Sequence, residues 1–244
     1  MRSLLLLIPI LVGLAGRAWA DPAVPVMVAT VIDGRTLSLA DGTVVRLAGI
    51  DIPAGRRRAM AADALRTLLQ GRAILVEGLG PVDRHGRLPG LIQRDDDADP
   101  VSDLVRQGLA RVDAGDAMPT AMLGVLLEEE AEARTQGVGL WADPAFAVRA
   151  ADGLGRDALD RFQIVEGRVL KAAVVRRRIY LNFGTDYARD FTVTIEPQVA
   201  ARAAAAGQNP QDLEGHRVRV RGWLDWSGGP RIAIDRIEQI ERLD

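Results

Sequence analysis

The sequence predicts an α+β protein that is mainly β, with a five-stranded barrel of the OB type and appended helices, followed by a second, smaller OB-like barrel. Three observations carry this prediction. Short segments with alternating apolar and polar residues are separated by Asp-Gly pairs, an alanine- and leucine-rich helical segment follows them, and a similar order recurs after residue 160. Strand-rich hairpins, a helix and two further strands are typical of the OB fold.

The first predicted unit begins with hairpins. Residues 26–45 alternate around Asp33-Gly34 and Asp41-Gly42, and Asp-Gly between alternating segments is a hairpin signal. Residues 44–50 continue as a strand, and Gly71 ends the first helix. The other elements expected in this unit are strands at residues 73–77 and 88–93 and helices at residues 59–69, 101–110 and 123–134. We expect Trp141 to anchor the end of the unit on the barrel.

A second unit is expected after a linker. Residues 147–160 are small and polar and show no strand pattern, so we assign the first unit to residues 27–146, the linker to 147–160 and the second unit to 161–243. In the second unit, alternation predicts strands at residues 164–175, 178–183, 191–195, 217–226 and 231–237 and a helix at residues 198–206. This order again follows the OB plan.

The N-terminus has the features of a signal peptide. Arg2 precedes an apolar run from Leu4 to Leu14, and Ala18-Trp19-Ala20 has the A-x-A form of a cleavage site. The apolar run is shorter than the roughly 20 residues that a membrane span needs. We therefore expect residues 1–20 to be removed and the protein to be exported, periplasmic or secreted, with no membrane span afterwards. An uncleaved N-terminal anchor is the alternative.

Charge and cysteine content narrow the function classes. The formal net charge is −2, and loss of Arg2 and Arg17 with a signal peptide would make it −4. The protein is therefore no polycation, and any affinity for phosphate must come from a local patch. It contains no cysteine, so after export to an oxidising compartment it would hold together by burial alone. Lys171 is the only lysine, so nearly all positive charge is guanidinium.

Two segments resemble the core signature of the staphylococcal nuclease, or thermonuclease-like, family. Residues 31–54 read VIDGRTLSLADGTVVRLAGIDIPA, and residues 83–87 read DRHGR. In that family the first segment normally contains Asp-Gly-Asp-Thr and ends in Asp-x-Pro-Glu. The resemblance covers about residues 27–146, where the order of elements also matches. It implies an OB-type barrel and calcium-dependent hydrolysis of phosphodiesters.

The resemblance implies a role for particular residues. Arg46 and Arg87 take the positions of the two arginines that clamp phosphate, and Asp51 takes that of a calcium ligand. Two residues depart from the family pattern. Arg35 stands where the family has another carboxylate ligand, and Ala54 stands where it has the glutamate that handles the attacking water.

These departures predict that catalysis is impaired or absent. They also predict that the protein holds no cofactor. Like charges ~4 Å apart repel by about 4 kcal/mol at an effective dielectric constant of ~20, and by twice that when one ion is divalent. Calcium needs about six to eight oxygen ligands, several of them anionic. Loss of a general base alone costs roughly 10²–10⁴-fold in rate. The sequence therefore favours a protein that is not an efficient enzyme.

The retained arginines predict an anion-binding site that contains no metal. Guanidinium groups bind phosphate through paired hydrogen bonds, so the expected ligand is single-stranded nucleic acid or another phosphate-rich polyanion. Asp51 would orient the arginines. The predicted phosphate-binding residues are Arg35, Arg46, Arg84 and Arg87.

Three alternatives stay open. In one, Arg46 pairs with Asp51 as a structural ion pair and no anion site exists. In another, the protein is an active metal-dependent phosphodiesterase that holds Ca²⁺ through Asp33 and Asp51. In the third, it is an envelope scaffold with no nucleic-acid role. The sequence does not determine the oligomeric state.

The second unit offers candidate stacking residues. OB folds bind single strands by stacking bases on exposed aromatic side chains near basic residues, and arginines are interleaved with aromatic residues between positions 176 and 231. We predict that Phe183 and Phe191 fill the core. Tyr187 and Trp226 lie in Gly- or Asp-containing loops and are the candidates for binding.

Overall fold

The computed structural model describes residues 24–244 except 95, 97, 187 and 188. The expected signal peptide at residues 1–20 and the candidate Tyr187 therefore lie outside the described residues. Within the described part of the chain, no helix has the length and apolarity needed to cross a membrane.

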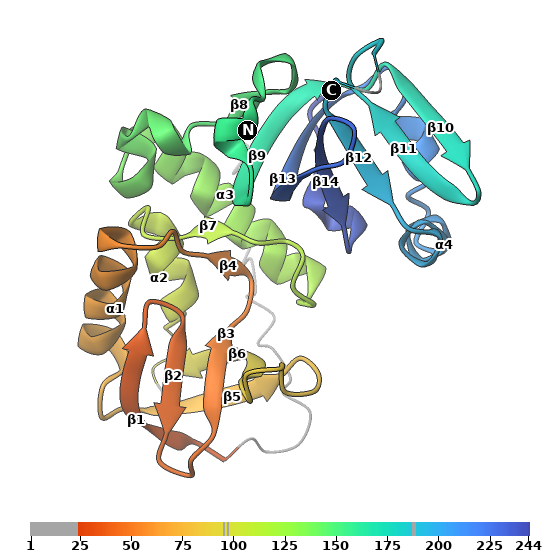
Figure 1. Ribbon diagram of the computed structural model, residues 1–244. Helices are drawn as coiled ribbons and strands as arrows, with labels where there is room; N and C mark the ends of the chain where they lie inside the picture. Colours follow the sequence, from red (N-terminus) through yellow and green to blue (C-terminus); the bar gives the residue numbers. More distant parts are fainter. Residues whose placement is uncertain (1–23, 95, 97, 187–188) are drawn as a thin grey trace, which may run out of the picture.

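The first sheet is a closed barrel with the strand order β1-β2-β3-β6-β5, and β1 also pairs with β5 (Figure 1). Its strands are β1 (Val26–Asp33), β2 (Thr36–Leu39), β3 (Val44–Leu47), β5 (Ala73–Gly78) and β6 (Leu88–Arg94). Strands β3 and β6 are parallel, whereas the other pairs are antiparallel. The predicted hairpins at Asp33-Gly34 and Asp41-Gly42 are confirmed.

Helices and a small two-stranded sheet pack around the barrel, with α1 alongside β1 (Figure 1). The helices are α1 (Arg56–Leu69), α2 (Pro100–Arg106) and α3 (Thr120–Gln136), and the small sheet pairs β4 (Ile50–Asp51) with β7 (Arg111–Val112). The predicted strand over residues 44–50 is divided because Gly49 has φ 80°. Helix α2 ends earlier than predicted because Gly108 has φ 61° and makes close contact with the Val138 carbonyl.

The second sheet has the path β10-β11-β12-β14-β13-β9-β8, with β15 added at β13. Its strands are β8 (Arg149–Ala150), β9 (Arg161–Arg168), β10 (Lys171–Val175), β11 (Arg178–Asn182), β12 (Thr192–Ile195), β13 (Arg217–Trp226), β14 (Pro230–Ile234) and β15 (Ile240–Arg242). Helix α4 (Pro197–Ala205) connects β12 to β13. Only residues 169–170 separate β10, at one end of the path, from β9, which is next to the strand at the other end.

The strand order of the second unit corresponds to that of the first when β9 and β10 are counted together as one strand. In the first unit β3 pairs in parallel with β6, and α1 lies between β3 and β5; in the second unit β12 pairs in parallel with β14, and α4 lies between β12 and β13. The OB plan expected for both units is therefore present. The second sheet differs from the expected barrel in that its hydrogen-bonded path runs from β10 to β8 instead of closing.

The two units have separate cores but are not separated by a free linker. One apolar cluster fills the barrel and its helices, and another fills the second sheet. Residues 147–160, expected to lack strand structure, include β8, which pairs in parallel with β9. Helix α3 and strand β7 lie between the barrel and the second sheet (Figure 1).

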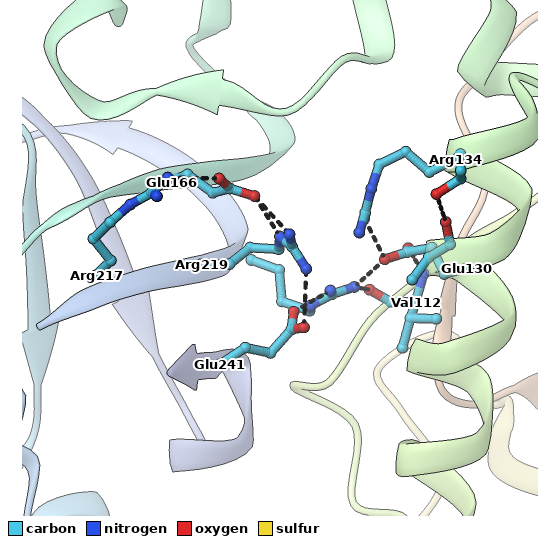
Figure 2. Close-up of polar contacts among 10 residues, drawn as sticks. Val112, Glu130, Arg134, Glu166, Arg217, Arg219 and Glu241 are labelled. Atoms are coloured by element: carbon cyan, nitrogen blue, oxygen red, sulfur yellow. Dashed lines mark hydrogen bonds and ion pairs between the residues drawn. The ribbon is translucent and has the colours of Figure 1, made fainter. Parts of the chain in front are cut away.

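A buried network of charges joins the units (Figure 2). Arg221 of β13 donates to Glu130 of α3 at 2.9 Å and to the Val112 carbonyl at 3.0 Å. Its other terminal nitrogen donates to Glu241 at 2.5 Å. Arg219 lies between Glu241 and Glu166. The Arg221 side chain is 1 % exposed and that of Glu130 is fully buried, so the second sheet is fixed against α3 and β7.

Candidate functional site

The turn between β1 and β2 positions Arg35 at one end of the barrel. The Asp33 carboxylate accepts a hydrogen bond from the Arg35 backbone N–H at 2.9 Å, as is usual for Asp in a tight turn. The Arg35 guanidinium donates to the Ile50 carbonyl at 3.0 Å. Burial, and after it the positive charge of Arg46, lowers the pKa of Arg35 from its ordinary value. Arg35 and Arg46 therefore lie close enough to repel each other.

Arg46 is held by a carboxylate that the sequence did not single out. Asp116 accepts from both terminal nitrogens of Arg46, at 2.8 and 3.1 Å, and from the Gly49 N–H at 3.0 Å. Burial lowers the pKa of Arg46, but the hydrogen bond and charge of Asp116 outweigh burial and raise it. Arg46 is therefore in an ion pair, as that alternative expected, but its partner is Asp116 and not Asp51.

Asp51 forms its ion pair with Arg111. The two residues are directly opposite each other in the β4–β7 pair, so their side chains lie on the same face. Asp51 Oδ2 accepts from Arg111 Nη2 at 2.6 Å and from Nε at 3.2 Å, and Arg111 also donates to the Phe162 carbonyl at 3.0 Å. The expected role of Asp51 in orienting the phosphate-clamping arginines is therefore wrong, because it orients Arg111.

Arg87 is paired within its own turn. Asp83 accepts from the Arg87 side chain at 2.9 Å and from its backbone N–H at 3.0 Å. Because Arg46 is opposite Pro89 in the β3–β6 register, this turn lies near Arg46. Arg84 is exposed and donates to the His85 ring at 3.1 Å, and no contact in the described residues joins it to Arg35 or Arg46.

Asp113 adds to the cluster a carboxylate whose charged form is disfavoured by its surroundings. It lies beside β7, its carboxylate accepts from the Gly115 N–H at 3.0 Å, and Asp116 and Asp51 are close. Burial, followed by the like charge of Asp116, raises the pKa of Asp113 to about 6. The end of the barrel thus combines guanidinium and carboxylate groups in a nearly compensated cluster.

The residues at this position do not fit calcium. Arg35 brings a cation to one ligand position, and Asp51 Oδ2 is already bound by Arg111. The Asp33 carboxylate is used by its own turn. Among the described residues, no group of three or more His, Cys, Asp or Glu side chains has the geometry to hold a metal ion. The donor set thus lacks the anionic oxygens that Ca²⁺ requires.

A cleft of about 450 Å³ opens between the two units at these residues. Its first wall contains Arg35, Asp51, Ala54 and Arg58, and its second wall comes mostly from β9 and β13. Four arginines and two aspartates line it, which leaves an excess of two positive charges: Arg35, Arg58, Arg111 and Arg161 against Asp51 and Asp160. Helix α1 begins at this cleft with no side-chain cap and no acidic residue in its first turn.

The second unit contributes a different aromatic residue from those predicted. Trp226 is half-buried, and the Arg156 guanidinium carbon lies 4.5 Å from its ring centroid. Trp223 is 58 % exposed and lines the cleft. Phe191 is buried in the second core and Phe183 is packed against it, as predicted.

Sequence reasoning missed Arg111 and Asp116, which form the ion pairs of the cluster, and also Asp113, a buried carboxylate near them. The segment Ala110–Asp116 had one usable signal: Arg111 and Asp113 flank the apolar Val112, so in an extended strand they share a face. Their partners are 60 to 70 residues away in the chain, which no local pattern indicates. Trp223 stood in a predicted strand, but alternation alone did not tell which face the first unit would cover.

Comparison with protein families agrees with the resemblance. Residues 44–143 match the family model described as staphylococcal nuclease homologue. The matched segment contains Arg46, Asp51, Ala54 and Arg87 and begins at β3. Over these residues the first unit is therefore similar to staphylococcal nuclease homologues. The comparison with curated proteins found no match.

Proposed function

We propose that the protein binds single-stranded nucleic acid or another phosphate-rich polyanion in the cleft between its units, without efficient hydrolysis. We further propose that it does so after export, in the periplasm or outside the cell. The observation that carries the proposal is the pair of guanidiniums on the first wall of the cleft, that of Arg35 at a family ligand position and that of Arg58 in the first turn of α1. Arg35 and Arg58 reach only backbone carbonyls within the described residues, those of Ile50 and Ile52.

The electrostatics of the cleft favour an anion. Burial, and after it repulsion from Arg46, lowers the pKa of Arg35, and the negative charge of a nearby phosphate would offset both effects. The excess of positive charge is local, because the whole chain has a net charge of −2. A local patch of this kind positions a nucleic-acid backbone independently of its sequence. Arg46 and Arg87 also lie at this end of the barrel. Their carboxylate partners neutralise their charge and occupy their hydrogen-bond donors, so they attract phosphate less strongly.

Bound single-stranded DNA is expected to remain intact, with or without Ca²⁺. Ala54 has no group that handles water, and Arg35 and Arg111 deny the metal its carboxylates. The loss of the general base alone accounts for roughly 10²–10⁴-fold in rate. Gel analysis of a labelled oligonucleotide after long incubation measures this. Cleavage that a chelator abolishes would contradict the proposal and restore the phosphodiesterase alternative.

Removing a cleft arginine is expected to weaken binding and reduce its dependence on salt. Arg58→Ala removes an exposed guanidinium from the first turn of α1, and Arg35→Gln removes a charge but keeps a donor for the Ile50 carbonyl. Each lost phosphate contact lowers the salt slope by about 0.7 for single strands. We expect affinity to fall about 3- to 10-fold at low salt, measured by fluorescence anisotropy with labelled oligothymidylate.

Arg72→Ala is the matched control for Arg58→Ala. Arg72 is also exposed, but it follows the other end of α1, and its carbonyl accepts from Val28 at the far end of the barrel. Its loss should leave affinity within about 2-fold, because the same charge is removed away from the cleft. Equal weakening by both variants would indicate diffuse attraction without a cleft site. No salt-dependent binding by the unaltered protein would favour the scaffold alternative.

A further inference from the structure

We infer that the second unit supplies a base-stacking platform, Trp223, so that the cleft takes an unpaired nucleobase next to the arginine-bound phosphate. This inference rests on the proposed function and extends it, because it assigns the ligand class and a binding role to the second unit. It also makes the first unit incomplete as a binding unit.

Trp223 is an exposed aromatic residue on a rigid support. Its side chain is 58 % exposed, and no other aromatic side chain in the described part of the chain is classed as exposed. It is opposite Phe162 in the β13–β9 register, and the two rings meet edge to face with centroids 6.4 Å apart. Phe162 is 2 % exposed and lies against the Arg111 guanidinium, 5.0 Å from ring centroid to Cζ. The exposed ring therefore packs against a buried ring on the neighbouring strand.

The strand that carries Trp223 is fixed to the first unit two residues earlier. Arg221 and Trp223 are separated by one residue on β13 and so lie on the same side of the strand. Arg221 is buried against Glu130 and the Val112 carbonyl. On this side of β13, Arg221 thus attaches the strand to the first unit, and Trp223 forms part of the wall of the cleft. A platform that is already ordered loses little entropy when it binds.

One wall of the cleft presents guanidinium groups and the other an aromatic ring. These suit the phosphate and the base of a nucleotide, respectively. The first wall has Arg35 and Arg58, and the second has the Trp223 ring with Arg161 beside it. The volume of about 450 Å³ lies within the range of roughly 300–1,000 Å³ typical of small-ligand sites. A base that enters between two protein walls has no room for its Watson–Crick partner. The cleft therefore favours single strands over duplexes.

The inference is tested by separating the contribution of bases from that of phosphates. Trp223→Ala is expected to weaken binding of oligothymidylate about 5- to 100-fold, while binding of inorganic polyphosphate and of an abasic oligonucleotide stays within about 2-fold. Trp223→Phe should recover most of the affinity, because it restores an aromatic face. A duplex of the same length should bind the unaltered protein no better than the abasic strand does. Because Trp223 is exposed, its variants should fold with unchanged melting temperature, which circular dichroism checks.

The outcomes distinguish failure of this inference from failure of the proposed function. If Trp223→Ala binds oligothymidylate as tightly as the unaltered protein, while Arg58→Ala binds it more weakly, the stacking platform is refuted and the anion site stands. If neither oligothymidylate nor polyphosphate binds, both ideas fail. If Trp223→Ala weakens polyphosphate binding to the same degree, the residue shapes the cleft and does not stack a base, which also overturns the inference.

Discussion

Replacing Arg221 with alanine is expected to lower the free energy of unfolding by about 3–5 kcal/mol. The guanidinium is 1 % exposed and satisfies Glu130, Glu241 and the Val112 carbonyl. Its removal leaves the fully buried Glu130 with only a 3.5 Å contact to Arg134 as an ion pair. A buried carboxylate without its partner is far costlier than the loss of a solvated ion pair. Urea denaturation followed by tryptophan fluorescence measures the loss.

Two further variants test whether the loss of stability comes from leaving Glu130 unpaired. Arg242→Ala removes a guanidinium on the neighbouring strand β15, whose side chain is 53 % exposed, and should change stability by about 0.5 kcal/mol or less. Adding Glu130→Gln to Arg221→Ala should recover part of the loss, because the neutral amide still accepts from the Val112 N–H and no buried charge remains unpaired. A loss below about 1 kcal/mol for Arg221→Ala would mean that water reaches Glu130 and that the network does not fix the units.

The same residue illustrates what the sequence could not provide. Arg217, Arg219 and Arg221 alternate with apolar residues, a pattern that normally places charges on the solvent face of a strand. The alternation correctly predicts β13. It does not tell that α3 covers this face, because Glu130 is 91 residues away from Arg221. When one unit packs against another and buries a charged side chain, the residue pattern of the strand itself does not show it.

Sequence signals that depend only on adjacent residues gave correct predictions. The Asp33-Gly34 turn needed only adjacent residues, and it appears at the predicted position. The start of α1 was missed by three residues, because Arg56 to Arg58 lack the capping residues that mark a helix start. The resemblance located Arg35, Arg46 and Asp51 at one end of the barrel. It could not indicate their partners, because Arg111 and Asp116 are brought there by β7 and the loop after it.

The ion pairs of the site bear on the proposal that it does not hold a metal. Arg111 occupies the carboxylate of Asp51, and Arg111 also donates to the Phe162 carbonyl of the second unit. Arg236 of the second unit donates to the Asp116 carbonyl at 2.6 Å, which holds the loop that pairs with Arg46. The carboxylates of Asp51 and Asp116 are therefore paired within the first unit, by segments that also contact the second unit. A substitution of Arg35 or Ala54 alone would not free them for a metal.

Asp113→Asn is expected to stabilise the protein at neutral pH, by roughly 2–3 kcal/mol, and to have no such effect near pH 4. Burial, then the charge of Asp116, raises the pKa of Asp113 in the folded protein to about 6, whereas an Asp in an unfolded chain titrates near 3.9. Between these values the folded state binds a proton that the unfolded state has lost. The contribution of Asp113 to stability is therefore fully present below about pH 4 and is lost as pH rises through about 6.

The asparagine variant removes this loss because its amide stays neutral and its oxygen still accepts from the Gly115 N–H. Denaturation of both proteins over the range from about pH 4 to 8 should give curves that coincide at the acid end and separate above pH 6. Asp152→Asn, at an exposed carboxylate, should follow the unaltered protein throughout. Asp116→Asn should have the opposite sign at neutral pH, because it takes from Arg46 the charge that compensates its burial. If Asp113→Asn is destabilising above pH 6, the attraction between Asp113 and Arg35 outweighs burial, and the cluster is a stabilising ion pair.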